Sequence, residues 1–145
     1  MLGSRVGVVH GHEREADMEK AMQIGEVAEL TGMSFRTLRH YDEVGLLSPS
    51  ARSQGGFRLY APEDLDQLLV IRRMKPLGFS LDEMLQVRLL TEKLKALPEP
   101  DADLQAELDD MIAEAHRRRE KLERNLGWAD EFIGILEGFR APQGD

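Results

Sequence analysis

Residues 24–60 of the chain read IGEVAELTGMSFRTLRHYDEVGLLSPSARSQGGFRLY, and the helix and turn signals of this stretch decide the fold. Its first apolar face recurs at helical spacing, at Ile24, Val27, Ala28 and Thr31. Gly32 is typical of a residue that ends a helix, and Ser34 is a good N-cap for a second helix over residues 35–44, which Gly45 ends. Two short helices joined by a glycine-containing turn predict a helix-turn-helix unit.

A small β-hairpin is expected directly after these two helices. Pro49 disfavours a helix, and the pair Gly55 and Gly56 is a turn signal. Beyond the turn, apolar residues alternate with an arginine. The sequence therefore predicts strands near residues 48–52 and 57–60.

Two further helices follow the hairpin. Pro62 suits a first helical position, so a third helix is predicted from there, closed by Gly78. Ser80 and Glu83 match a capping box that opens a fourth helix through about Leu97.

The C-terminal part is predicted to be one long amphipathic helix. Residues 98–100, Pro-Glu-Pro, form a short linker, and the helix spans residues 101–140. No other segment of the chain matches its length, so its apolar stripe is expected to pair with a second copy as a coiled coil. Gly127 and Gly134 are positions where the helix could bend or end. The residues expected at the dimer interface are Leu104, Leu108, Met111, Ala115, Leu122, Ala129, Phe132 and Leu136.

Composition narrows the class of protein. The 145 residues include no cysteine, which excludes disulfides, thiolate metal sites and cysteine nucleophiles. No nucleophile, metal cluster or phosphate-binding loop is recognisable, so neither an enzyme nor a cofactor is predicted. No apolar stretch approaches the length of a membrane span, and the cytoplasm is the expected location. Residues 1–22 look like a polar leader, and residues 141–145 like a short tail.

The net charge of −8 is unevenly distributed. Residues 23–80 carry seven Lys and Arg against seven Asp and Glu, whereas residues 81–145 carry nine against sixteen. DNA phosphates respond to local potential, so a balanced segment with grouped arginines can still bind a duplex. The acidic C-terminal part should repel the DNA phosphates and should not bind a duplex.

The second helix has a polar face that could read DNA. Successive residues advance by about 100°, which brings together Arg36, Arg39, His40 and Glu43. Phe35, Leu38 and Asp42 fall roughly opposite, so the expected hydrophobic anchor of the helix is separated from its polar reading edge. For this helix alone, a solvated basic face is an equally good interpretation. Arg52 and Arg58 on the two strands of the hairpin favour DNA.

Residues 23–84 resemble the DNA-binding domain of the MerR family of bacterial regulators, chiefly through TLRHYDEVGLL and the hairpin sequence ARSQGGFRLY. Within the family, the sequence LRHYDEVGLL is most similar to that of the TipA-like branch. The resemblance implies a mainly α fold: a winged helix-turn-helix domain and connecting helix over residues 23–97, then an antiparallel coiled coil joining two subunits. It also implies a regulator that binds a pseudo-palindromic promoter and distorts it, so that RNA polymerase can engage both of its recognition elements. Such a regulator is typically an activator, and the residues alone leave repression open as well.

The resemblance also implies which residues contact DNA. Those on the recognition helix are Arg36, Thr37, Arg39, His40 and Tyr41, and those on the wing are Arg52, Phe57, Arg58 and Tyr60. His40 and Phe57 depart from the family, which often has tyrosine at both positions. Because Phe57 lacks a hydroxyl group, packing is expected for it rather than a phosphate contact.

The resemblance does not extend to an effector. Metal-sensing and redox-sensing branches use cysteines, and drug-sensing branches add a large C-terminal domain. Only six residues follow Phe139, so no large effector domain is expected, and a small-molecule effector stays unidentified. Trp128, Phe132 and Phe139 could line a small pocket, although helix packing is the simpler interpretation.

Two other functions stay open on the residues alone. A DNA architectural or excision factor could use the same winged head without an effector response, as a monomer or a polymer on DNA. The long C-terminal stripe weighs against it. Alternatively, the head could bind another protein, in which case replacing Arg39 and Arg58 by alanine would leave partner binding intact.

Overall fold

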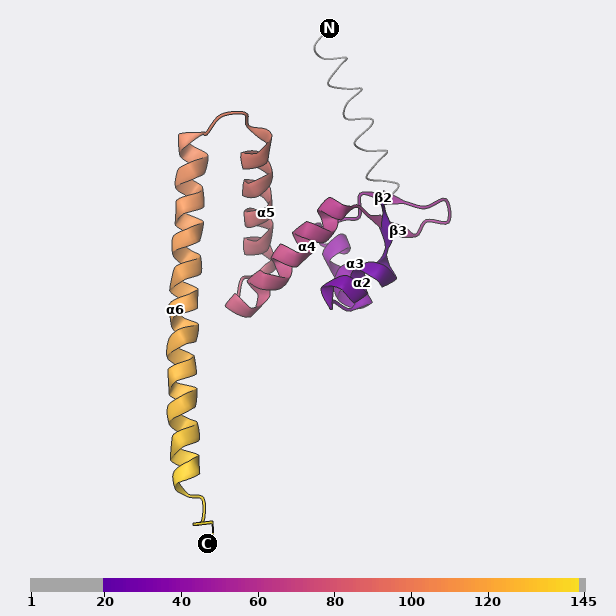
Figure 1. Ribbon diagram of the computed structural model, residues 1–145. Coiled ribbons are helices and arrows are strands. Elements are labelled where there is room, and N and C mark those ends of the chain that lie inside the picture. The colour runs from indigo at the N-terminus through magenta and orange to yellow at the C-terminus, as the bar shows by residue number, and fades with distance from the viewer. Residues whose placement is uncertain (1–19, 144–145) are drawn as a thin grey trace. The chain divides into compact units, whose positions relative to one another are not determined.

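The computed structural model describes residues 20–143 and is mainly helical (Figure 1). The described chain divides into two compact units. We call residues 20–76 with 80–85 the head, and residues 77–79 with 86–143 the rod unit. The elements, in chain order, are β1 (Met22–Gln23), α2 (Ile24–Thr31), α3 (Phe35–Glu43), β2 (Ala51–Arg52), β3 (Arg58–Tyr60), α4 (Pro62–Met74), the 3-10 helix η1 (Lys75–Leu77), α5 (Leu81–Ala96) and α6 (Ala102–Gly138).

The predicted helix-turn-helix is confirmed. Helix α2 ends at Gly32, whose φ of 72° is left-handed, a conformation that glycine adopts without strain. The Ser34 hydroxyl oxygen caps α3 by accepting a hydrogen bond of 3.0 Å from the backbone N–H of Thr37. Gly45, with φ 77°, follows the end of α3. Local signals therefore set both helix boundaries.

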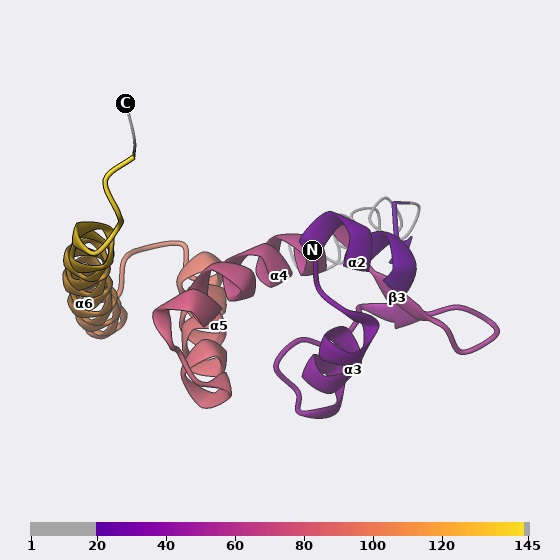
Figure 2. The ribbon, with the colours of Figure 1, turned by 90° about the horizontal axis from the view of Figure 1, so that it is seen from below.

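The predicted hairpin is also confirmed, within a sheet of three strands in the order β1-β3-β2. Arg52 pairs with Arg58 across the antiparallel β2–β3 ladder, and the loop between them projects from the sheet in both ribbon views (Figures 1 and 2). The sequence did not predict β1, in which the buried Met22 pairs with Tyr60. Residues 1–19 of the predicted leader and residues 144–145 of the tail lie outside the described residues.

The head has a continuous apolar core, contributed by α2, α3, α4 and the sheet. Leu38 and Tyr41 are the side chains that bury α3 in it. The expectation that Phe35 anchors this helix is wrong, because Phe35 is exposed. Phe35 is the first residue of α3, and Tyr41, about 1.7 turns later, is buried instead. The fully buried side chains include Val27, Leu46, Tyr60, Leu68 and Ile71.

The rod unit consists of the 37-residue helix α6 with the 86–96 part of α5 beside its first half (Figure 1). Asp101 caps α6 by accepting a hydrogen bond of 3.0 Å from the backbone N–H of Leu104. The helix continues past Gly127 and Gly134 without ending. None of its residues is buried. The observed helix, Ala102–Gly138, thus lies inside the predicted range of residues 101–140.

Arg118 joins α6 to residues 77–79 of the same unit. Its guanidinium carbon lies 4.0 Å from the centroid of the Phe79 ring, and its Nη1 donates to the Leu77 carbonyl at 3.5 Å. Glu114 accepts from its Nε at 2.9 Å. A residue that interrupts the apolar stripe in sequence therefore makes a cation–π contact in the fold.

Candidate nucleic-acid interface

Helix α3, the second helix of the helix-turn-helix, presents polar side chains to solvent. Arg36, Arg39 and His40 are exposed, as the helical spacing predicts. The Arg39 guanidinium lies 5.9 Å from the centre of the exposed Phe35 ring. Thr37 is half-buried, and its hydroxyl oxygen accepts from Ser34 at 2.9 Å. The two arginines and His40 thus form an accessible face, whereas Thr37 serves the cap of the helix.

Asp42 links this helix to both strands of the wing. A single carboxylate oxygen, Oδ2, accepts from Arg58 Nε at 2.8 Å and from Arg52 Nη2 at 3.0 Å. The Asp42 side chain is only 12% exposed. Each guanidinium has five N–H donors, so both arginines keep donors for a further anion. The geometry therefore sets the direction of two wing cations relative to α3.

The ionisation of Asp42 is secured by these contacts. Burial pushes the pKa of the Asp42 carboxyl up, but hydrogen bonds from Arg58, Ser48 and Arg52 outweigh burial and hold that pKa below its usual value. Asp42 is therefore a carboxylate at neutral pH. Together with its two arginines it forms a group of net charge +1.

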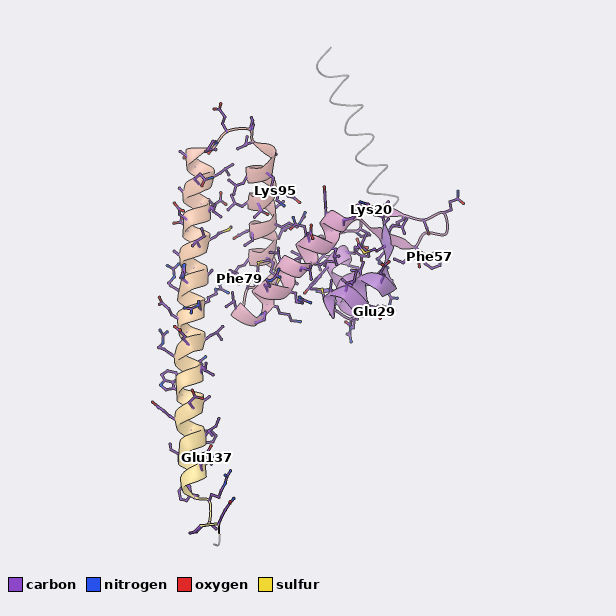
Figure 3. All side chains as sticks on the ribbon, in the orientation of Figure 1. Lys20, Glu29, Phe57, Phe79, Lys95 and Glu137 are labelled. Carbon is purple, nitrogen blue, oxygen red and sulfur yellow. The ribbon has the colours of Figure 1, made fainter. Side chains whose placement is uncertain are left out.

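The wing loop is closed by its own backbone. Ser53 N donates to the Phe57 carbonyl at 2.8 Å, and Phe57 N donates to Ser53 Oγ at 3.1 Å. Gly56 N donates to the Ser53 carbonyl at 2.9 Å, which closes the turn. The expectation that Phe57 packs is wrong, because its side chain is 66% exposed on the wing (Figure 3). One edge of the ring lies over Gly55 of the same loop, where an added Cβ atom would come within 3.1 Å of it.

Asp64, in the first turn of α4, ties the base of the wing to the head. Its Oδ2 accepts from Ser50 Oγ at 2.6 Å, from Ser50 N at 3.1 Å and from Ala61 N at 2.8 Å. The last of these bonds caps α4, because it satisfies a backbone donor that precedes the helix. One carboxylate thus fixes both the entry of β2 and the start of α4.

Tyr41 and Tyr60, which were predicted to contact DNA, are buried in the head. Burial raises the pKa of both phenols, so both stay neutral. The Tyr60 hydroxyl makes no hydrogen bond within residues 20–143. In this structure the two rings lie beneath the arginine-bearing surface and support α3 and β3.

The residues predicted for dimerisation fall into two groups along α6. The first four are half-buried on the side of α5; they are Leu104, Leu108, Met111 and Ala115. Leu108 and Leu94 of α5 line one cavity, which shows that this half of the stripe faces α5. The second four are exposed; they are Leu122, Ala129, Phe132 and Leu136. Figure 3 shows the side chains around Glu137 with no other element of the rod unit beside them.

Sequence reasoning missed several residues of both surfaces. Asp42 and Asp64 were not expected to organise the wing, because their partners are distant in sequence. Ile112, Leu126 and Ile133 are exposed on α6 and were also missed. The sequence contained a signal that could have identified these three residues. They belong to a series of positions that includes Leu122 and alternates steps of three and four residues. Trp128, Phe132 and Phe139, considered as pocket residues, are exposed as well.

Residues 20–143 contain no group of three or more metal-ligating side chains. In the same range, no helix is both long enough and apolar enough to cross a membrane.

Comparison with known proteins gives a consistent result. A sequence profile described as MerR HTH family regulatory protein matches residues 22–87. The chain is 37% identical to an HTH-type transcriptional regulator of Pseudomonas aeruginosa, over 83% of this chain and 89% of that protein. It is 37% identical to the HTH-type transcriptional activator TipA of Streptomyces coelicolor, over 79% of this chain and 39% of TipA.

A solved structure agrees in fold. A MerR family transcriptional regulator from Bacillus cereus superposes with a TM-score of 0.60 at 29% identity, over 81% of this chain and 78% of that one. The chain spans about two fifths of the length of the first curated relatives it matches. From the profile match, and from a relative covered over nearly its whole length, the chain belongs to the MerR family of helix-turn-helix regulatory proteins.

Proposed function

We propose that the chain is a dimeric, sequence-specific transcription regulator that acts in the cytoplasm on a pseudo-palindromic promoter. Helix α3 enters the major groove, where Arg36, Arg39 and His40 reach base edges and phosphates. The wing then lies against the neighbouring backbone with Arg52 and Arg58. The observation that carries this proposal is the Asp42 carboxylate of α3, which binds the guanidiniums of both wing strands and so ties the wing to that helix.

The exposed stripe on α6 supports a dimer. A solvent-facing row of large apolar side chains over residues 122–139 costs free energy in an isolated chain, and pairing with a second copy removes that cost. Two heads on one antiparallel coiled coil match a site with two-fold symmetry. The alternative of an architectural or excision factor that acts as a monomer leaves this stripe without a role.

Activation is the proposed output. The TipA and mta relatives are named transcriptional activators. By the family resemblance, the dimer would distort an overlong promoter spacer so that RNA polymerase contacts both recognition elements. Bending a duplex costs a few kcal/mol, which contacts along both heads can offset.

The test begins with selection of an operator from genomic DNA and transcription from the recovered promoter. Arg36→Ala with Arg39→Ala should then weaken operator binding by roughly a hundredfold or more, since each base or phosphate contact contributes about 1–3 kcal/mol. The control is Arg124→Ala, which removes an exposed cation from α6. If the double variant and the control bound the operator equally well, α3 would not be the reading element.

Salt dependence supplies an independent check. Removal of an arginine that contacts phosphate should reduce the slope of log affinity against log salt by about 1. We expect this for Arg58→Ala and not for Arg124→Ala. An unchanged slope for Arg58→Ala would exclude the wing from phosphate contact.

A further inference from the structure

We propose that Phe35 is a residue that determines sequence specificity. Its exposed ring contacts the C5-methyl group of a thymine in the major groove and positions the Arg39 guanidinium next to that contact. The inference rests on the proposed function, in which α3 enters the major groove. It adds the kind of base that the first residue of α3 selects in each half-site. All residues involved belong to the head.

Phe35 is the exception among the large apolar side chains of α3. Leu38 and Tyr41 are 1% and 4% exposed, whereas Phe35 is 45% exposed. A single exposed apolar residue is common on protein surfaces, so the exposure alone indicates no function. What distinguishes Phe35 is its position, because it lies next to Arg39 at the N-terminal end of the helix.

The start of α3 is set by its cap, and Phe35 follows directly after the cap. The backbone N–H of Leu38 donates to the Ser34 carbonyl at 3.1 Å, which closes the first turn around Phe35. Side chains of a helix lean toward its N-terminus, so the Phe35 ring projects from the end of α3. In helix-turn-helix proteins, the N-terminal residues of the second helix contact base edges. The ring therefore lies on the part of α3 that comes nearest to the bases in the proposed complex.

The ring has two neighbours within the head. Successive residues advance by about 100°, so Phe35 and Arg39 lie about 40° apart around α3. The guanidinium carbon of Arg39 is 5.9 Å from the centroid of the ring, within the range of a cation–π contact. A Cβ atom added to Gly25 would lie 3.9 Å from Phe35 Cζ, so the ring lies next to the first turn of α2. These neighbours restrict the ring before DNA binds, which lowers the entropy cost of a contact.

The chemistry of the ring suits one feature of the major groove. Phenylalanine has no hydrogen-bond donor or acceptor in its side chain, so it cannot read the polar edges of the bases. The thymine C5-methyl group is apolar, and an A·T pair displays it where a G·C pair does not. One turn of α3 rises about 5.4 Å, or about one and a half base-pair steps. The thymine should therefore lie within about two base pairs of the group that Arg39 contacts.

Operators that contain deoxyuridine test the contact, because uracil differs from thymine only by the missing methyl group. In the operator selected by the natural protein, each symmetry-related pair of thymines is replaced in turn. We expect replacement of one such pair to weaken binding by the natural full-length protein about tenfold, since each half-site loses one buried methyl group. Phe35→Ala should bind the thymine and uracil forms of that operator with equal affinity.

Two further variants serve as controls. Val70→Ala removes another exposed apolar side chain from the head, on α4, and should respond to uracil as the natural protein does. Phe35→Leu keeps an apolar group at the position and should keep part of the response. If Phe35→Ala lost as much affinity as the natural protein on every thymine replacement, the contact with Phe35 would be excluded.

A double-mutant cycle tests whether Phe35 positions Arg39. Phe35→Ala and Arg39→Ala together should cost less operator affinity than the product of the two single losses, because Phe35→Ala already releases the guanidinium. We expect a coupling of about threefold. Losses that simply multiply would show that the ring does not position Arg39.

The results also separate this contact from the proposed function. A natural protein that selects an operator but does not distinguish thymine from uracil at any position would overturn the contact and leave the regulator standing. A natural protein that selects no operator would remove the regulator and the contact with it. Circular dichroism checks that Phe35→Ala is folded, and we expect its spectrum to match that of the natural protein because Phe35 lies outside the core.

Discussion

The head and the second half of α6 bury their apolar side chains to opposite degrees. Leu38 in the head is 1% exposed, whereas Leu126 on α6 is 63% exposed. Both are leucines in regular helices, so the difference lies in what surrounds them. The head buries its apolar side chains in a core of its own and needs no other surface to shield them from solvent. The second half of α6 has a stripe that only another surface can cover, and the two regions should therefore respond differently to the same change.

The largest expected effect comes from one substitution made in both regions. Leu38→Ala should lower the free energy of unfolding by about 2–5 kcal/mol, because it leaves a cavity in a closed core. This loss should not depend on protein concentration. Leu126→Ala should leave the stability of dilute protein nearly unchanged and act only at concentrations where copies pair. Urea unfolding at two concentrations, followed by circular dichroism, measures both, and equal losses at the lower concentration would refute the comparison.

A second change tests whether the surface of the head depends on Asp42. Asp42→Asn removes the charge that directs Arg52 and Arg58, so the arginines should bind phosphates less selectively. We expect the ratio of operator to non-specific affinity to fall about tenfold, or roughly 1.4 kcal/mol. Asp66→Asn, an exposed carboxylate in α4 of the head, is the control. The same ratio in both variants would show that Asp42 does not organise the wing.

Glycine substitutions give a smaller effect of opposite sign in the two regions. Gly45→Ala should destabilise the head by about 1 kcal/mol, since its φ of 77° is strained for any residue with a Cβ atom. Gly134→Ala should stabilise α6 by about 0.5–1 kcal/mol, because it lies inside a helix and its Cβ would meet no atom within 4 Å. Thermal melts of both variants provide the measurement. Stabilisation by Gly45→Ala would contradict the conformation found after α3.

The smallest effect concerns acid. Because the pKa of Asp42 lies below its usual value, the folded head binds this proton less readily than the unfolded chain. Its contribution to stability is therefore present at neutral pH and is lost as pH falls below about 4. Natural protein should lose more stability than Asp42→Asn between pH 5 and pH 3. Parallel losses in the two proteins would exclude Asp42 as a source of acid sensitivity.

Much of the fold follows from short-range signals. Gly32, Ser34 and Gly45 set the ends of α2 and α3 through capping and left-handed backbone, which depend on neighbours in sequence. The resemblance found over residues 23–84 is confirmed by the family match over residues 22–87. The prediction that the chain is no enzyme agrees with its membership of a family of DNA-binding regulators.

The parts that sequence reasoning missed depend on contacts between distant residues. Strand β1 has only two residues and exists because it pairs with β3. In the sequence, Arg118 is a charged residue that interrupts the apolar stripe of α6. Its partner in the structure is the ring of Phe79, which is far away in sequence. The two bonds of Asp42 reach 10 and 16 residues along the chain. Helix and strand periodicity in the sequence does not indicate contacts between residues so far apart. The arrangement of the wing arginines could therefore be seen only in the structure.

The unbroken course of α6 past both internal glycines restricts how its length can change in evolution. Insertion of one residue would rotate everything beyond it by about 100° and turn part of the stripe away from the second copy in the proposed dimer. Insertion of seven residues would keep the stripe nearly straight and lengthen the helix by about 10 Å, close to three base pairs of DNA. Related chains should therefore differ in this helix by whole heptads, with operators whose half-site spacing differs in matching steps.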